Sequence, residues 1–357
     1  MAGRLRLSPL HIVWLFVAAL IVGAAAGGLS ITTNDFSGFY ASARAWREGR
    51  PLYTDTAAAP NLNPPSLAVL LSPLTLVTPA VAYAMWTALG VLSVVASIRR
   101  ISGRTTLTPE TRFWMVTMLT GWAPATVVWQ EGQLTWVLLY LVSRAWLAST
   151  PVRAGLWLTP AVMLKPPLAL MAALTPWPIP LITGLVAATG TVATVALTGW
   201  QAWRDWLNQS RTMSWVGDWS NVSLWGLAAR AHGWDVQGTG LYDIVPLAAA
   251  TIIVVGVILA VQVLRRDGGA RWTLALLWSL FLSPAGWSYY LPLALGPALA
   301  TWRDGWPTRT ALAMTAVPIF VLGAFRFYLA GGTVLLGSVH FVAAALLWLA
   351  WTRQARR

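Results

Sequence analysis

The chain contains no cysteine and, for its 357 residues, few charged side chains. Without cysteine it can form no disulfide, no thiolate metal site and no cysteine nucleophile. Charged residues make up only 10% of the sequence, against about 25% in an ordinary soluble domain. Hydrophobic residues make up 57%. This composition excludes an ordinary soluble protein and indicates an integral membrane protein.

Acidic residues and lysine are also scarce. The 24 basic residues outnumber the 11 acidic ones, and every basic residue except Lys165 is arginine. Such an excess can indicate a nucleic-acid-binding protein. Here the arginines stand in short groups between long apolar runs, which is typical of the cytoplasmic loops of a multi-pass membrane protein. We therefore expect membrane lipids, and no nucleic acid, among the partners.

Histidine is the third rare residue. His11, His232 and His340 are far apart in the sequence and lack metal-ligand spacing. No glycine-rich phosphate loop or nucleophile elbow is present either. We expect no metal ion and no cofactor.

The apolar runs predict an all-α, polytopic transmembrane helix bundle that forms a single domain over residues 1–357. About 12 spans are expected, at 12–29, 66–98, 113–128, 134–148, 154–164, 167–176, 181–199, 242–264, 272–283, 288–301, 309–328 and 334–352. Several of these runs have only 10 to 14 residues, whereas a straight span needs about 20. Short runs of this kind predict helices broken by proline around a buried cavity.

Two of these spans have alternatives. Arg4 and Arg6 precede the first run and favour a cytoplasmic N-terminus, but the small residues at 24–26 could also be the cleavage site of a secretory signal peptide. The run at 66–98 contains Pro73 and Pro79 and is interpreted as one kinked span, because a basic loop follows it. A short hairpin there would invert the topology of everything that follows.

The arginine-rich loops place the other polar segments outside the cytoplasm, on the extracytoplasmic face of the cell membrane. These segments are residues 30–65, 129–133, Lys165, 200–240 and 283–290. Within the first of them, apolar residues recur at helical spacing, which predicts a helix over 36–47 lying in the membrane interface.

Asp35 follows the first apolar run and is the first candidate for chemistry. A carboxylate at this place could act as a general base toward a substrate at the membrane surface. Asp or Asn before a helix is also an ordinary N-cap, whose side-chain oxygen accepts a backbone N–H. The spacing alone leaves both interpretations open.

Lys165 stands between an apolar run and two prolines. In a cavity, its ammonium group could bind a phosphate. Snorkelling from a helix end to the membrane surface is the alternative.

Ionisable and amide side chains near a membrane are candidate site residues because they are costly there. Besides Asp35 and Lys165, the same face gathers Glu131, Gln133, Asn221 and Arg230. Tryptophan is abundant, with 24 in the chain and seven in 200–240. Most of these are expected in the interfacial belt, and a few could stack on sugars or line a lipid-chain groove.

Several short motifs then occur in a fixed order along the chain. They are Asn34-Asp-Phe-Ser-Gly-Phe-Tyr40, Gly49-Arg-Pro-Leu-Tyr53, Pro64-Pro65, Ser72-Pro-Leu74, Gly132-Gln133, Lys165-Pro-Pro167, Asn221-Val-Ser-Leu224 with Arg230, and Leu282-Ser-Pro-Ala-Gly-Trp287. In these motifs the chain resembles glycosyltransferase family 87, whose members use polyprenol-phosphate sugars and have the multi-span GT-C architecture. Where that family often carries an acidic residue and a histidine after the last motif, this chain has Ser288-Tyr289-Tyr290.

The resemblance implies an enzyme, a mannosyltransferase-like hexosyltransferase. It would transfer a sugar from a polyprenyl-phosphate donor to a hydroxyl of a cell-envelope glycan or glycolipid, with inversion. Asp35 matches the family's catalytic carboxylate. The expected substrate-binding residues are Glu131, Gln133, Lys165, Asn221, Arg230, Trp287, Tyr289, Tyr290 and Arg326.

Two other classes of protein remain as alternatives. In a polytopic transporter or lipid flippase, broken helices and intramembrane charges would define a substrate path. Inverted repeats, which would favour that class, are not found in the sequence. A structural subunit of an envelope-assembly complex would leave the gathered polar residues unexplained.

Overall fold

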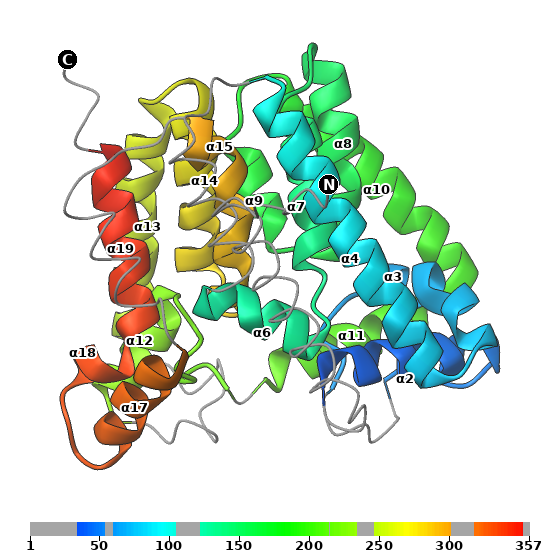
Figure 1. Cartoon of the computed structure of the whole chain (residues 1–357), viewed down its shortest axis with the longest axis horizontal. Coiled ribbons are helices and arrows are strands. Elements are labelled where there is room, and N and C mark those ends of the chain that lie inside the picture. The colour runs from blue at the N-terminus through cyan, green and yellow to red at the C-terminus, as the bar shows by residue number, and fades with distance from the viewer. Residues whose placement is uncertain are drawn as a thin grey trace, which may run out of the picture.

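A computed structural model of the chain describes residues 34–53, 60–104, 122–213, 215–233, 246–300 and 318–352. Within these ranges the structure is helical (Figure 1) and has no named strand. The helices are α2 (Asp35–Arg47), α3 (Pro65–Leu71), η1 (Ser72–Leu76), α4 (Pro79–Ser102), α6 (Ala123–Glu131), α7 (Thr135–Trp146), α8 (Pro151–Leu164), α9 (Leu168–Ala173), α10 (Ile179–Thr198), α11 (Trp200–Arg211), α12 (Leu224–Ala231), α13 (Pro246–Leu264), α14 (Gly268–Leu282), η3 (Ser288–Ala294), α15 (Leu295–Ala300), α17 (Pro318–Leu329), α18 (Val334–Gly337) and α19 (Val339–Thr352). The expected span at 12–29 lies outside the described residues.

Three of the described helices are long and apolar enough to cross a membrane: α4 with 24 residues, α10 with 20 and α13 with 19. The expectation of about 12 spans is therefore not confirmed, although the helical membrane fold is compatible with the structure. Both α10 and α13 expose large apolar side chains, such as Val192 and Ile253. Such surfaces suit contact with lipid tails rather than water.

The shorter helices form the interior. Nearly every residue of α14 from Trp272 to Phe281 is buried, and α7 packs between α4 and α8. Proline at the first turn begins α4, α6 and α8, where a missing N–H costs no hydrogen bond. The prediction of short helices broken by proline is confirmed at Pro166 and Pro167, which separate α8 from α9.

The run at 66–98 is not one kinked span. It contains α3 and η1, an extended break at Val77 and Thr78, and then α4, which begins at Pro79. The seven residues of α3 extend about 10 Å at 1.5 Å per residue, too little to cross a bilayer. By length and composition only α4 is suited to cross a membrane, which favours a single passage through this run.

The helix predicted over 36–47 is present as α2, which begins one residue earlier than expected, and its place in the membrane interface stays a prediction. Phe36, Phe39 and Ala43 lie on its buried face, and arginines occupy its exposed last turn. In Figure 1, α2 and α11 lie together at the lower end of the bundle, beside the ends of the long helices. The hydroxyl of Tyr40 donates to the carbonyl oxygen of Val77, 2.9 Å away, and so ties α2 to the start of α4.

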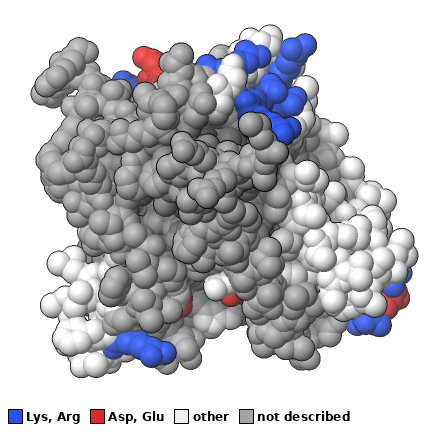
Figure 2. All heavy atoms as spheres, in the orientation of Figure 1, with Lys and Arg blue, Asp and Glu red and all other residues white. Residues whose placement is uncertain are grey.

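Arginines cluster at one end of several helices of the bundle. Arginines occupy the last turns of α4 and α7, the first turns of α8 and α14 and the connection from α13 to α14, namely Arg99, Arg100, Arg144, Arg153, Arg271, Arg265 and Arg266. Figure 2 shows basic side chains along the upper edge of the molecule, with further basic patches at its lower left and lower right, the latter beside acidic side chains. The α6–α7, α8–α9 and α14–η3 junctions lie at the opposite end of these same helices, and they build the site described next.

Candidate active site

Asn34 and Asp35 stand at the start of α2 and have different partners. Asn34 is the N-cap, because its Oδ1 accepts the backbone N–H of Ser37 at 3.0 Å. Asp35 is the first helical residue, and its carboxylate accepts a hydrogen bond from the side-chain amide of Gln133. The backbone N–H of Asp35 points to the carboxylate of Glu131, 3.4 Å away. The N-cap interpretation of Asp35 is therefore wrong.

Gly132 brings Gln133 to Asp35. It ends α6 in the left-handed conformation, with φ of +63°, which L-residues with a side chain rarely adopt. A Cβ atom here would also lie 2.8 Å from both Phe36 and Tyr83. The carbonyl oxygen of Gly132 accepts the indole N–H of Trp86 at 2.8 Å. Only glycine allows α6 and α7 to join so close to α2.

Lys165 ends α8 and is buried, with 6% of its surface exposed. Its Nζ donates to Oδ1 of Asn63 at 3.3 Å and lies 5.1 Å from the centre of the Tyr290 ring. The aromatic face adds an electrostatic attraction for the cation. The ammonium group points into the protein rather than snorkelling to the membrane surface.

Two loops far apart in the sequence form a third wall. Asn221 and Trp287 make an isolated antiparallel bridge, in which Val222 N–H donates to Gly286 at 2.7 Å and Ser288 N–H to Ser220 at 2.6 Å. The side-chain amide of Asn221 donates to the carbonyl oxygens of Val216 and Pro284. Asn221 therefore holds the loops together and leaves ligand contact to its neighbours.

Arg230 supports the same wall from behind. It is 1% exposed, and its guanidinium donates to the carbonyl oxygens of Asp218 (2.6 Å) and Asn221 (3.1 Å) and to Oγ of Ser338 (2.8 Å). These bonds use donors on all three nitrogens. The structure therefore places Arg230 as a brace for the loop and not on the surface of the cavity.

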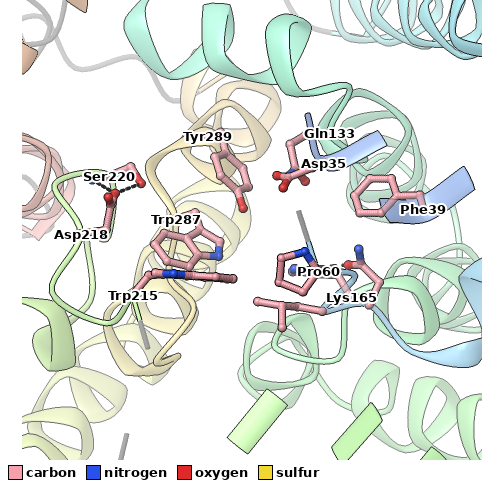
Figure 3. Close-up of a pocket in the computed structure, with 12 residues that line it drawn as sticks. Asp35, Phe39, Pro60, Gln133, Lys165, Trp215, Asp218, Ser220, Trp287 and Tyr289 are labelled. Carbon is pink, nitrogen blue, oxygen red and sulfur yellow. Dashed lines mark hydrogen bonds between the residues drawn. The ribbon is translucent and has the colours of Figure 1, made fainter. Parts of the chain in front are cut away.

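These walls enclose a cavity of about 200 Å³, here named the polar chamber (Figure 3). It is lined by Asp35, Phe39, Pro60, Leu62, Asn63, Gln133, Lys165, Trp215, Asp218, Ser220, Trp287 and Tyr289. The rings of Trp287 and Tyr289 lie 6.2 Å apart, at 23° to each other.

Of the residues expected in the site, five line the polar chamber: Asp35, Gln133, Lys165, Trp287 and Tyr289. Glu131, Asn221, Arg230 and Tyr290 contact its walls. Arg326 is exposed on α17 and lines neither this chamber nor the apolar cavity described below. A role for Arg326 in phosphate binding stays a prediction.

Three polar residues of the chamber were not expected from the sequence: Asn63, Asp218 and Ser220. Asn63 directly precedes the Pro64-Pro65 motif, and this position could have drawn attention to it. Asp218 and Ser220 lie in a segment rich in polar residues and tryptophan, where nothing local distinguishes them.

A second cavity, of about 330 Å³, adjoins the polar chamber and shares Leu62 and Lys165 with it. We name it the apolar cavity. Its other lining residues are Pro166, Pro167, Trp206, Leu207, Ser210, Arg211, Met213, Ser283, Pro284 and Ala285. Lys165 thus stands where a polar space meets a largely hydrophobic one.

Burial changes the acidity of Asp35 and Lys165, which both line the chamber and lie outside the three long apolar helices. Burial raises the pKa of Asp35 to about 7, and the carboxylate of Glu131 adds to this rise, against the opposing effects of Lys165 and Gln133. Burial lowers the pKa of Lys165 to about 8, although Asp35 partly opposes that change. A base and a cation can therefore coexist near neutral pH.

The geometry offers a desolvated carboxylate, a buried ammonium group and aromatic faces around one small polar space. Within the described ranges, no group of three or more His, Asp or Glu side chains is placed to hold a metal ion.

Residues 61–285, more than half of the chain, match the sequence profile of glycosyltransferase family 87. The chain belongs to this family. The membership makes the protein a glycosyltransferase and an enzyme. Neither the curated proteins nor the solved structures contain a match to the chain. The matched segment includes Gln133, Lys165 and Asp218 of the polar chamber, whereas Asp35 precedes it and Trp287 follows it.

Proposed function

We propose that this family 87 enzyme transfers a hexose, with mannose the first sugar to test, from a polyprenyl-phosphate donor to a hydroxyl of a cell-envelope glycan or glycolipid. One observation carries the proposal. The ammonium group of Lys165 lies where the polar chamber, which contains Asp35, meets the apolar cavity.

The two cavities suit the two parts of a lipid-linked sugar. A phosphate bound at Lys165 would gain a charge-assisted interaction that is strong because the site is desolvated. The isoprenoid chain would occupy the apolar cavity, where its burial is favourable by about 0.8 kcal/mol per methylene. The hexose, joined to the other side of the phosphate, would then lie in the polar chamber.

The proposed reaction is a single displacement with inversion at the anomeric carbon. Asp35 removes the proton of the acceptor hydroxyl while the oxygen of that hydroxyl forms a bond to the anomeric carbon. The bond from that carbon to the phosphate oxygen breaks, and its electron pair leaves with the polyprenyl phosphate, whose charge Lys165 stabilises. Asp35 ends the step protonated and returns the proton to water.

The arginines at the helix ends opposite the chamber support one orientation in the membrane. The arginines at the α4, α7 and α8 ends lie opposite the polar chamber along the same helices. Since basic loops stay in the cytoplasm, we infer that the chamber opens on the extracytoplasmic face of the cell membrane. A lipid-linked donor suits this face because its lipid chain keeps it in the membrane, within reach of a chamber at the membrane surface.

A donor comparison tests the proposal. Purified protein in lipid vesicles is incubated with a short-chain acceptor glycolipid and either radiolabelled polyprenyl-phosphate mannose or radiolabelled GDP-mannose. We expect labelled product from the polyprenyl donor only. Labelling from the nucleotide sugar alone would contradict the lipid-phosphate assignment. In the same assay, polyprenyl-phosphate glucose as the better donor would replace mannose, and a pentose donor as the better one would contradict the hexose.

A further inference from the structure

The polar chamber contains a second carboxylate that the proposed reaction does not use. Asp218 lines the chamber on the loop 215–223, and Figure 3 shows it on the far side of Trp287 and Trp215 from Asp35 and Lys165. Its side chain is partly exposed to the chamber.

The local fold accounts for only one of the two oxygens of Asp218. Its Oδ1 accepts the backbone N–H of Ser220 at 2.8 Å and the Ser220 hydroxyl, which together form an Asx turn. For Oδ2, no hydrogen bond with a described residue is recorded. Asparagine would form the same turn without a charge. The fold therefore does not require the negative charge at this position.

Arg230 does not neutralise this charge by direct pairing. Its guanidinium donates to the carbonyl oxygen of Asp218 rather than to the carboxylate, and no salt bridge to Asp218 occurs in the described part of the chain. Burial raises the pKa of Asp218 from its ordinary value. The Ser220 hydrogen bonds and the charge of Arg230 oppose this rise, but they leave Oδ2 without a hydrogen bond to a described residue. A carboxylate oxygen beside a cavity can accept hydrogen bonds from a ligand.

The neighbouring side chains suit a sugar ring. Trp215 and Trp287 line the chamber next to Asp218 and Ser220, and Tyr289 stacks beside Trp287. An indole face offers a flat apolar surface to the C–H groups of a sugar, while carboxylate and hydroxyl oxygens bind its hydroxyl groups.

The position of Lys165 indicates that the sugar bound here is the donor sugar and not the acceptor. With the phosphate at Lys165 and the lipid chain in the apolar cavity, the sugar joined to that phosphate extends into the polar chamber, whose opposite wall carries Asp218. We propose that Asp218, Ser220 and Trp287 form the subsite that binds the hydroxyl groups of the donor hexose. This inference rests on the proposed function and adds the residues that recognise the sugar.

The test compares donors with and without the sugar. Binding of polyprenyl-phosphate mannose and of sugar-free polyprenyl phosphate is measured for wild type, Asp218→Asn and a control, Asp267→Asn. Asp267 is exposed at the arginine-rich end of the molecule. The Asn variant retains the Asx turn, and intact folding is verified by thermal unfolding in detergent.

We expect Asp218→Asn to weaken binding of the mannosyl donor about 10- to 100-fold, the range of one lost charge-assisted hydrogen bond. Binding of sugar-free polyprenyl phosphate should stay unchanged, and the control should bind both ligands like wild type. Equal weakening for both ligands, or no change for either, would overturn the subsite. If wild type binds no polyprenyl-phosphate ligand at all, the proposed function itself fails.

Discussion

Asn34 and Asp35 are consecutive residues, and the first caps α2 while the second turns its carboxylate into the polar chamber. Oδ1 of Asn34 accepts the N–H of Ser37, and the carboxylate of Asp35 accepts the amide of Gln133. The positive end of the α2 dipole lies next to Asp35 and favours its ionised form. The cap is therefore supplied without using the candidate base.

Alanine substitutions should separate these two roles. Asn34→Ala removes the cap and should cost about 1 kcal/mol of stability. Asp35→Ala leaves the cap in place, and relief of the desolvated carboxylate should offset the lost hydrogen bond from Gln133, so we expect little net loss of stability. Thermal unfolding in detergent measures both, with Asn34→Asp as the control that keeps a capping oxygen. A loss for Asp35→Ala as large as that for Asn34→Ala would contradict the division.

Removing the charge of Lys165 should weaken donor binding. Lys165→Gln deletes one charge-assisted contact to the phosphate, worth about 1.5 to 3 kcal/mol, or roughly 10- to 150-fold in affinity. Titration with sugar-free polyprenyl phosphate measures the effect directly. Arg153→Gln, an exposed change at the opposite end, is the control and should bind like wild type. Unchanged affinity in Lys165→Gln would remove Lys165 from the phosphate site.

Sequence alone identified much of this site because polar residues are scarce in the chain. Asp35, Gln133 and Lys165 stand out where nearly every neighbour is apolar, and the structure brings all three to one cavity. Asp218 could not be found in this way. It reaches the chamber because residues 220–222 pair with residues 286–288, and no local pattern encodes a contact across more than 60 residues.

The same limit applies to Arg230 and to the number of spans. The guanidinium of a buried arginine can donate hydrogen bonds either to a phosphate or to backbone carbonyl oxygens. Only the structure shows that the Arg230 guanidinium donates to backbone carbonyl oxygens and to Ser338. Hydropathy locates apolar runs but not the breaks within them. It could not show that α3 and α9, with seven and six residues, are too short to cross a membrane.

The pH dependence should be bell-shaped. Asp35 must be ionised to accept a proton, so kcat/KM should rise as the pH increases through about 7. Lys165 must be protonated to bind phosphate, so kcat/KM should fall as the pH increases through about 8. Lys165→Gln should lose the alkaline limb and keep the acidic one. A rate that stays constant between pH 5 and 7 would contradict the assignment of Asp35.

The topology can be tested with single cysteines, because the chain has none. Gln130 and Thr212 are exposed near the site, whereas Ser149 and Asp267 are exposed at the arginine-rich end. A membrane-impermeant maleimide should label Gln130→Cys and Thr212→Cys in intact cells. Ser149→Cys and Asp267→Cys should react only after the cells are permeabilised. The reverse pattern would place the chamber on the cytoplasmic face.

Asp35→Asn tests whether Asp35 is the general base of sugar transfer, because asparagine has a similar shape but accepts no proton. The measurement is the turnover of purified enzyme with saturating polyprenyl-phosphate mannose and acceptor, with donor binding measured in parallel. We expect Asp35→Asn to bind the donor like wild type but to turn over at least about 100-fold more slowly, because general base catalysis usually contributes a factor of this size. Turnover near the wild-type rate in Asp35→Asn would contradict this assignment and make Glu131 the next carboxylate to test.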